Sequence, residues 1–381
     1  MISAAIDRVI AVVDDVIRPG SSDWDREGRW PEEAVRALQT SGLAGAMVPR
    51  DLGGLEVGLS GLLELCELVG AADASVGLCF GMHCVGTACL AARSTPDHDE
   101  RFLRPIAEGK HWTTLALSEP GTGSHFYFPE TEMLSTDDAY VLTGSKCFVT
   151  NGGHADSYVV SCVAGGNTPL GHFSMLVVEA DALAGGWGPP WDGFGMRANS
   201  SRTVSLDGVT VPAPNLLGQE GDQIWYVFHV VAPSFLVAMA GTYLGVATRA
   251  FEEARGHLLE RRMSHTGRAL AGADVLQHRL GTVWGRLQAA RSLCRWAAEQ
   301  ADRGAEDAIP ALCAAKAQVG DAAVSIVNDC LTLVGGRGYA RESMLPRLLR
   351  DARAVHVMSP TTDLLYTWTG RSLLDLPLLG D

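Results

Sequence analysis

Hydrophobic residues recur every three or four positions in the first and last thirds of the chain, a spacing typical of helices that bury one face. The clearest segments with this spacing are 5–17, 32–43, 62–69, 247–260, 274–303, 309–334 and 345–358. Between them, over about 113–222, short β-branched runs are separated by Gly, Asn, Asp and Pro about every ten residues, which is typical of antiparallel strands. We therefore predict an α+β chain with an N-terminal helical domain (1–112), a central antiparallel β-barrel domain (113–222) and a C-terminal four-helix bundle (223–381).

One apolar stretch, residues 230–247, contains no charged residue and is about long enough to raise the question of a membrane span. Pro233, Ser234, Thr242 and Tyr243 interrupt it, and a strongly charged segment follows at once. A helix that is apolar on all sides is also what the centre of a large bundle requires. We therefore predict a buried helix and no membrane span.

The overall charge narrows the classes of partner. The 381 residues include 30 Lys and Arg against 44 Asp and Glu, a formal net charge of −14, which disfavours binding to nucleic acid. None of the nine cysteines forms a C-x-x-C pair, so we expect free, mostly buried thiols, no metal site and a cytoplasmic protein. The first twenty residues lack the basic start of a signal peptide.

Three segments contain candidate chemistry. Residues 115–124 combine two glycines with hydroxyl side chains after a predicted strand, although an ordinary turn explains them equally well. Residues 144–153 end in Asn151-Gly152, a hairpin signal, and include Phe148, which could stack on a flat cofactor. Residues 332–351 place a glycine cluster between two helices, which by itself could be a simple helix end.

In this order and spacing, the three segments resemble the signatures of the acyl-CoA dehydrogenase family of flavoproteins, and the resemblance spans nearly the whole chain. The matching stretches are 116–124, 146–152 and 335–351, with further similarity at 48–55 and 193–203. The resemblance implies the three-domain fold described above. It also implies FAD between the β domain and the bundle, in a homodimer or homotetramer.

The resemblance assigns roles residue by residue. It implies that Leu117, Ser118 and Ser124 line the flavin and the thioester, and that Phe148, Val149 and Thr150 contact the isoalloxazine ring. It places Arg261 on the FAD pyrophosphate of a neighbouring subunit, with Gly335 and Gly336 along the same cofactor. The other cofactor-binding candidates are Gly123, Asp274, Thr361 and Asp363, and the substrate-binding candidates are Ser124 and Ser359.

The sequence departs from the family at the catalytic base. The family's glutamate, which removes the α proton of the substrate, usually lies eight residues after Asp351, where this chain has Ser359 followed by Pro360. The alternative position on the first bundle helix is Phe235, and Leu236 replaces an arginine that contacts CoA. A serine hydroxyl is a poor general base unless another base activates it. The remaining base candidates are three isolated histidines, His83, His229 and His356, each of which could equally be structural.

Three functions remain open at this point. The first is an FAD-dependent oxidoreductase that oxidises an acyl-CoA or acyl-ACP (acyl carrier protein) thioester, with a displaced base or unusual regiochemistry and an unknown electron acceptor. The second is a flavin-dependent monooxygenase or oxidase on the same fold. The third is a non-catalytic subunit of a hetero-oligomeric dehydrogenase.

Overall fold

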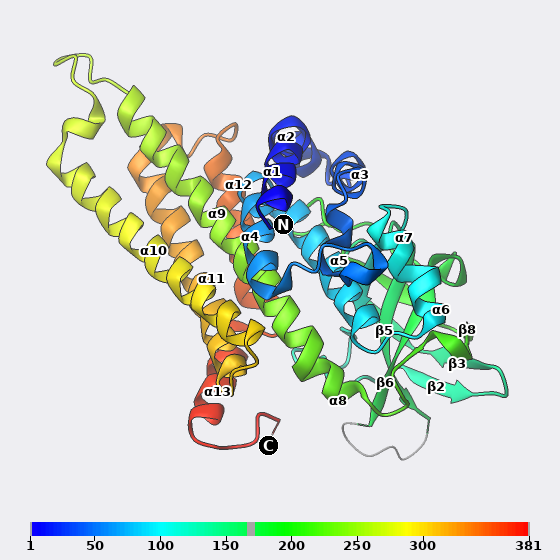
Figure 1. The fold of residues 1–381 in the computed structure, drawn as a ribbon. Helices are drawn as coiled ribbons and strands as arrows, with labels where there is room; N and C mark the ends of the chain where they lie inside the picture. Colours follow the sequence, from blue (N-terminus) through cyan, green and yellow to red (C-terminus); the bar gives the residue numbers. More distant parts are fainter. Residues whose placement is uncertain (1, 166–171, 380–381) are drawn as a thin grey trace.

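Helices form the N-terminal part of the computed structural model, which describes residues 2–165 and 172–379 (Figure 1). These helices are α1 (Ile2–Val12), α2 (Arg18–Glu27), α3 (Glu32–Thr40), α4 (Gly58–Ala72), α5 (Ala74–Ala92), α6 (Pro96–His98) and α7 (Arg104–Ala107). Helix α5 is apolar on nearly all sides, and it packs against α4, α9 and the first strand.

The central region is a β structure built from two sheets. Its strands are β1 (Thr113–Ala116), β2 (Glu132–Ser135), β3 (Ala139–Thr143), β4 (Ser145–Val149), β5 (Ser157–Ala164), β6 (Phe173–Glu179), β7 (Arg202–Ser205), β8 (Val209–Pro212) and β9 (Leu216–Leu217). The larger sheet has the order β8-β3-β2-β5-β6-β9, with β1 also paired to β5, and β4 pairs with β7. Most pairs are antiparallel as predicted, but β1 and β2 run parallel to β5.

The C-terminal region is a helical bundle that lies beside the other two regions (Figure 1). Its helices are α8 (Gln223–Tyr226), α9 (Ala232–Glu260), α10 (Asp274–Asp302), α11 (Ala308–Val334), α12 (Met344–Val357) and α13 (Thr362–Leu373). The predicted fold class, with helical, β and helical regions in succession, is confirmed.

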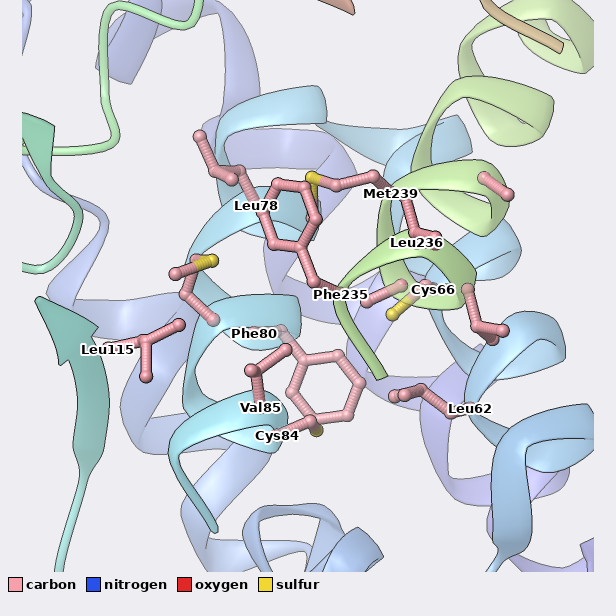
Figure 2. Close-up of a cluster of buried hydrophobic side chains, with 14 of the residues drawn as sticks. Leu62, Cys66, Leu78, Phe80, Cys84, Val85, Leu115, Phe235, Leu236 and Met239 are labelled. Atoms are coloured by element: carbon pink, nitrogen blue, oxygen red, sulfur yellow. The ribbon is translucent and has the colours of Figure 1, made fainter. Parts of the chain in front are cut away.

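The uncharged stretch 230–247 forms the buried part of α9. A Cβ atom on Gly241 or Gly245 would overlap backbone atoms of α4, so the two helices approach closely enough to require glycine. Phe80 of α5 and Phe235, Leu236 and Met239 of α9 fill the core around this contact (Figure 2).

Three described helical segments are long and apolar enough to cross a membrane by length and composition: Ala74–Ala92, Ile224–Glu260 and Ala308–Arg337. In the first two, 94% of the apolar window is buried inside the protein, and in the third 44%. Packing within the fold therefore accounts for the apolar character of the first two.

Candidate functional site

A cavity of about 460 Å³ lies where the three regions meet. Its walls come from α5, the turn after β1, strand β4, the loop 191–199, the start of α9 and the segment between α12 and α13. Leu78, Met82 and Phe235 make one side apolar, and Ser118, Thr150 and other hydroxyl side chains lie elsewhere in the lining. Convergent polar groups in a mostly apolar cavity are typical of a small-molecule site.

The cavity brings together nine residues that the sequence singled out: Leu117, Ser118, Gly123, Ser124, Phe148, Thr150, Phe235, Ser359 and Thr361. Val149 is buried within β4, and Arg261 lines a second cavity. The other candidates lie outside both linings: Asp274, Gly335, Gly336, Asp363, His83, His229 and His356.

A buried ion pair supports the turn after β1. The Lys146 ammonium donates to the Glu119 carboxylate, to Ser161 Oγ at 2.9 Å and to the Leu117 carbonyl at 3.4 Å. Glu119 also accepts hydrogen bonds from the backbone N–H groups of Glu130 (2.6 Å) and Thr131 (3.1 Å), and from the Thr131 hydroxyl. Burial lowers the pKa of Lys146, and the adjacent Glu119 carboxylate opposes that shift. The pair therefore fixes Leu117 and Glu119 at the cavity wall.

The structure places no free carboxylate in this cavity. Among its lining residues, all of which are described, Glu119 and Cys147 are the titratable ones. Glu119 is engaged by four donors, and burial raises the pKa of the Cys147 thiol. Ser359 donates its hydroxyl proton to the Ser124 carbonyl at 2.9 Å, and Phe235 presents a hydrocarbon ring. None of these groups is set up to remove a proton from carbon.

The three candidate histidines are not catalytic bases in this cavity, and that expectation is corrected. His83 is fully buried, its Nε2 lies 2.9 Å from the Ala44 carbonyl, and its Nδ1 accepts from Thr113 N–H at 3.1 Å. Burial lowers the pKa of His83 to about 4, so the ring is neutral and structural. His229 is exposed and bonds to the Trp225 carbonyl, and His356 lies 3.4 Å from Asp321.

Helix α12 holds the loop 191–199 against the cavity. Asp351 is buried and accepts a hydrogen bond from the Met196 backbone N–H at 2.7 Å. Its neighbour Arg350 pairs with Asp25 at 2.6 Å and donates to the Phe194 carbonyl at 2.9 Å. The

Asp351 should make stability depend on pH. Burial raises its pKa from 3.8 to about 7, so the folded protein binds one more proton than the unfolded chain between about pH 4 and pH 7. Stability from this group is complete below pH 4 and is lost as the pH rises through 7. The amide of Asp351→Asn can still accept from Met196 but cannot ionise. The stability of this variant relative to wild type should rise by up to about 1.4 kcal/mol per pH unit in that window.

Urea unfolding of both proteins at pH 5, 6 and 7 measures this difference. Asp321→Asn provides a control at an exposed carboxylate. A parallel pH dependence of wild type and Asp351→Asn would show that Asp351 is already ionised in the folded protein at pH 5.

A second, larger cavity of about 1080 Å³ lies at the end of the bundle where α9 and α11 finish and α12 begins. Its lining is strongly charged on residues from all three helices: Arg249, Glu252, Glu253, His257, Glu260, Arg261, Arg262, Arg337 and Glu342. In the described residues, no group of three or more His, Cys, Asp or Glu side chains is arranged to hold a metal ion. All nine cysteines are free, and eight are buried.

The residues present fit a cofactor with a flat ring and a phosphate-bearing tail. Phe148 is 66% exposed, although it borders an apolar cavity, and its φ is 54°. A non-glycine residue in this conformation is strained, and such strain clusters at ligand sites. Trp191 lies edge-on to Phe148, with ring centroids 6.2 Å apart. A stacked ring would cover this exposed aromatic surface, and the arginines of the second cavity would suit phosphates.

The comparisons with known proteins cover nearly the whole chain. Acyl-CoA dehydrogenase models match in three successive parts: the N-terminal domain over residues 3–110, the middle domain over 114–209 and the C-terminal domain over 236–374. A cyclohex-1-ene-1-carbonyl-CoA dehydrogenase from Geobacter metallireducens is 29% identical over 370 residues, covering 97% of each chain.

Solved structures agree with the sequence matches. Butyryl-CoA dehydrogenase from Megasphaera elsdenii superposes with a TM-score of 0.90 at 25% identity, over 97% of each chain. A structure reported with the electron transferring flavoprotein of Acidaminococcus fermentans superposes with a TM-score of 0.91 at 25% identity, over 97% of this chain and 96% of that one.

Proposed function

We propose a specific role for this chain, which belongs to the acyl-CoA dehydrogenase family: it oxidises an acyl thioester without a glutamate base at either of the family's usual positions. FAD is the cofactor, and when bound it accepts the hydride that leaves the substrate. The observation that carries the proposal is the composition of the first cavity. It is large enough for a ligand, yet its one carboxylate is bound by four donors.

The chain's own residues would bind and orient the thioester. Leu78, Met82 and Phe235 form an apolar wall that would hold the acyl chain and exclude water. The hydroxyl of Ser118, at the opposite wall, is a donor for the thioester carbonyl. Since proton removal by a cavity carboxylate is not provided for, the base is displaced or the oxidised bond differs from the α,β bond.

The carrier of the acyl group is a further part of the proposal. Leu236 is 1% exposed and packs in the core near Leu62 and Cys66 (Figure 2), so position 236 makes no contact with a carrier. An acyl carrier protein thioester is therefore proposed beside acyl-CoA. The likeness to a structure reported with an electron transferring flavoprotein supports a partner of that kind as the electron acceptor.

Simple straight-chain esters should be poor substrates. A positioned base contributes on the order of 10²–10⁴-fold to such reactions, so butyryl-CoA and octanoyl-CoA should bleach the flavin slower by about that factor than they bleach a glutamate-bearing relative. Anaerobic stopped-flow mixing with a panel of acyl-CoA and acyl-ACP thioesters measures the rates, with the M. elsdenii enzyme as reference.

Fast bleaching by another thioester of the panel supports the proposal and identifies the substrate. Rapid turnover of butyryl-CoA would reveal a base that the cavity does not show, and would contradict it. Flavin that stays oxidised with every thioester also contradicts it. Turnover with an external reductant and O₂ would then indicate a monooxygenase or oxidase, and silence there too would indicate a non-catalytic subunit.

A further inference from the structure

The second cavity contains a cation that the resemblance does not assign. Arg337 lies in the glycine cluster at the end of α11, between Gly336 and Gly338, and it is exposed on the cavity wall. Arg261 lies on the same wall but follows α9, so the two arginines come from different helices that finish at one end of the bundle (Figure 1).

The two arginines differ from the other cations of this cavity. Arg249 is paired with Glu253, and Arg262 donates to the Gly267 carbonyl at 3.2 Å. Within the described chain, the guanidinium groups of Arg261 and Arg337 have neither an ion pair nor a hydrogen bond. Their charges converge on His257: burial lowers the pKa of His257, and the nearby Arg337 and Arg261 lower it further.

We propose that Arg337 acts with Arg261 to bind the diphosphate of a nucleotide in this second cavity. Guanidinium groups match phosphate oxygens in geometry as well as in charge. Arg261 alone would face a diphosphate beside Glu252 and Glu260, whose charges oppose the anion. A second arginine restores an attractive site.

The carboxylates of the cavity suit the rest of such a ligand. Glu252, Glu260 and Glu342 line the cavity, and no ion pair engages them. A carboxylate is a good acceptor for the hydroxyl groups of a ribose, as in dinucleotide-binding folds. A cavity with arginines and free carboxylates together therefore fits a nucleoside diphosphate better than it fits inorganic phosphate alone.

Two sources could supply this chemistry: the ADP half of FAD, or a separate nucleotide. The first source rests on the proposed function, because it requires FAD to be the cofactor. Apoprotein of wild type, Arg337→Ala, Arg337→Lys and Arg341→Ala is titrated with FAD and with FMN, which lacks the ADP half, and the holoenzymes are titrated with ADP. Arg341 is exposed, four residues on and outside the cavity lining, so its variant is the matched control.

We expect Arg337→Ala to weaken FAD binding on the order of ten- to a hundredfold, as loss of a charge-assisted contact predicts. FMN binding should not change, Arg337→Lys should recover part of the loss, and Arg341→Ala should bind like wild type. Light scattering of each variant checks that assembly is intact. The binding titrations need no substrate, so a wrong choice of thioester cannot affect them.

A loss of ADP binding to the holoenzyme in Arg337→Ala, with unchanged FAD binding, supports the diphosphate site and assigns it to a separate nucleotide. Equal FAD and ADP affinities for Arg337→Ala and Arg341→Ala would overturn the proposal. Equal weakening of FAD and FMN would overturn it as well, because the effect would then not concern the diphosphate.

Discussion

Replacing Lys146 with methionine should lower the free energy of unfolding by about 3–5 kcal/mol. The substitution keeps most of the apolar stem but leaves the Glu119 carboxylate buried without its cation. Removing one partner of a buried ion pair is far more costly than the pair's own net stabilisation, because the remaining charge stays desolvated. Urea unfolding followed by circular dichroism measures the loss.

Lys110 provides the matched control for this experiment. Its ammonium lies 2.7 Å from Glu108, and both side chains are more than half exposed, so Lys110→Met should change stability by less than about 0.5 kcal/mol. The double variant Glu119→Gln, Lys146→Met removes both charges and should recover part of the loss. If Lys146→Met proved as stable as Lys110→Met, the buried pair would not be what holds the turn at Leu117.

Most of the fold could be predicted from the sequence because its signals are local. The helical spacing of 247–260 and 309–334 needs only neighbouring residues to be recognised, and α9 and α11 include these segments. The parallel pairing of β1 with β5 was missed because it joins strands that start 44 residues apart, and nothing within either strand encodes its partner. Sheet pairing is fixed by tertiary packing rather than by local propensity.

The cavity was predicted less completely, for the same physical reason. Ser118, Ser124, Phe148 and Ser359 were found through short signatures, whereas the partnership of Glu119 and Lys146 depends on contact across 27 residues. The one available signal was a charged residue inside each of two apolar, strand-like runs. His83 was considered as a base because a sequence cannot reveal that the Ala44 carbonyl and Thr113 occupy both of its nitrogens.

The missing base gives the other large expected effect. Ser359→Glu should raise the rate at which butyryl-CoA bleaches the flavin by at least roughly tenfold, short of the 10²–10⁴-fold that a well-placed base contributes. The position borders the cavity, and Lys316 holds the adjoining backbone by donating to the carbonyls of Val355 and Pro360, each at 2.9 Å. The apolar lining should raise the pKa of the new carboxyl, which favours its role as a base near neutral pH.

Pro360 limits how well the new glutamate can be aimed, since a proline restricts the backbone of the residue before it. Ser359→Glu with Pro360→Gly should therefore gain more than the single variant, while the carbonyl at position 360 remains available to Lys316. Ser359→Gln is the matched control: it has nearly the same shape but cannot take a proton, so it should gain nothing. If Glu and Gln gave equal rates, the gain would come from altered packing rather than from a base. If neither glutamate variant gained any rate while both still bound FAD, the cavity would be shaped for a different bond or for oxygen chemistry, and the loss of the glutamate would be one part of a wider change in the site.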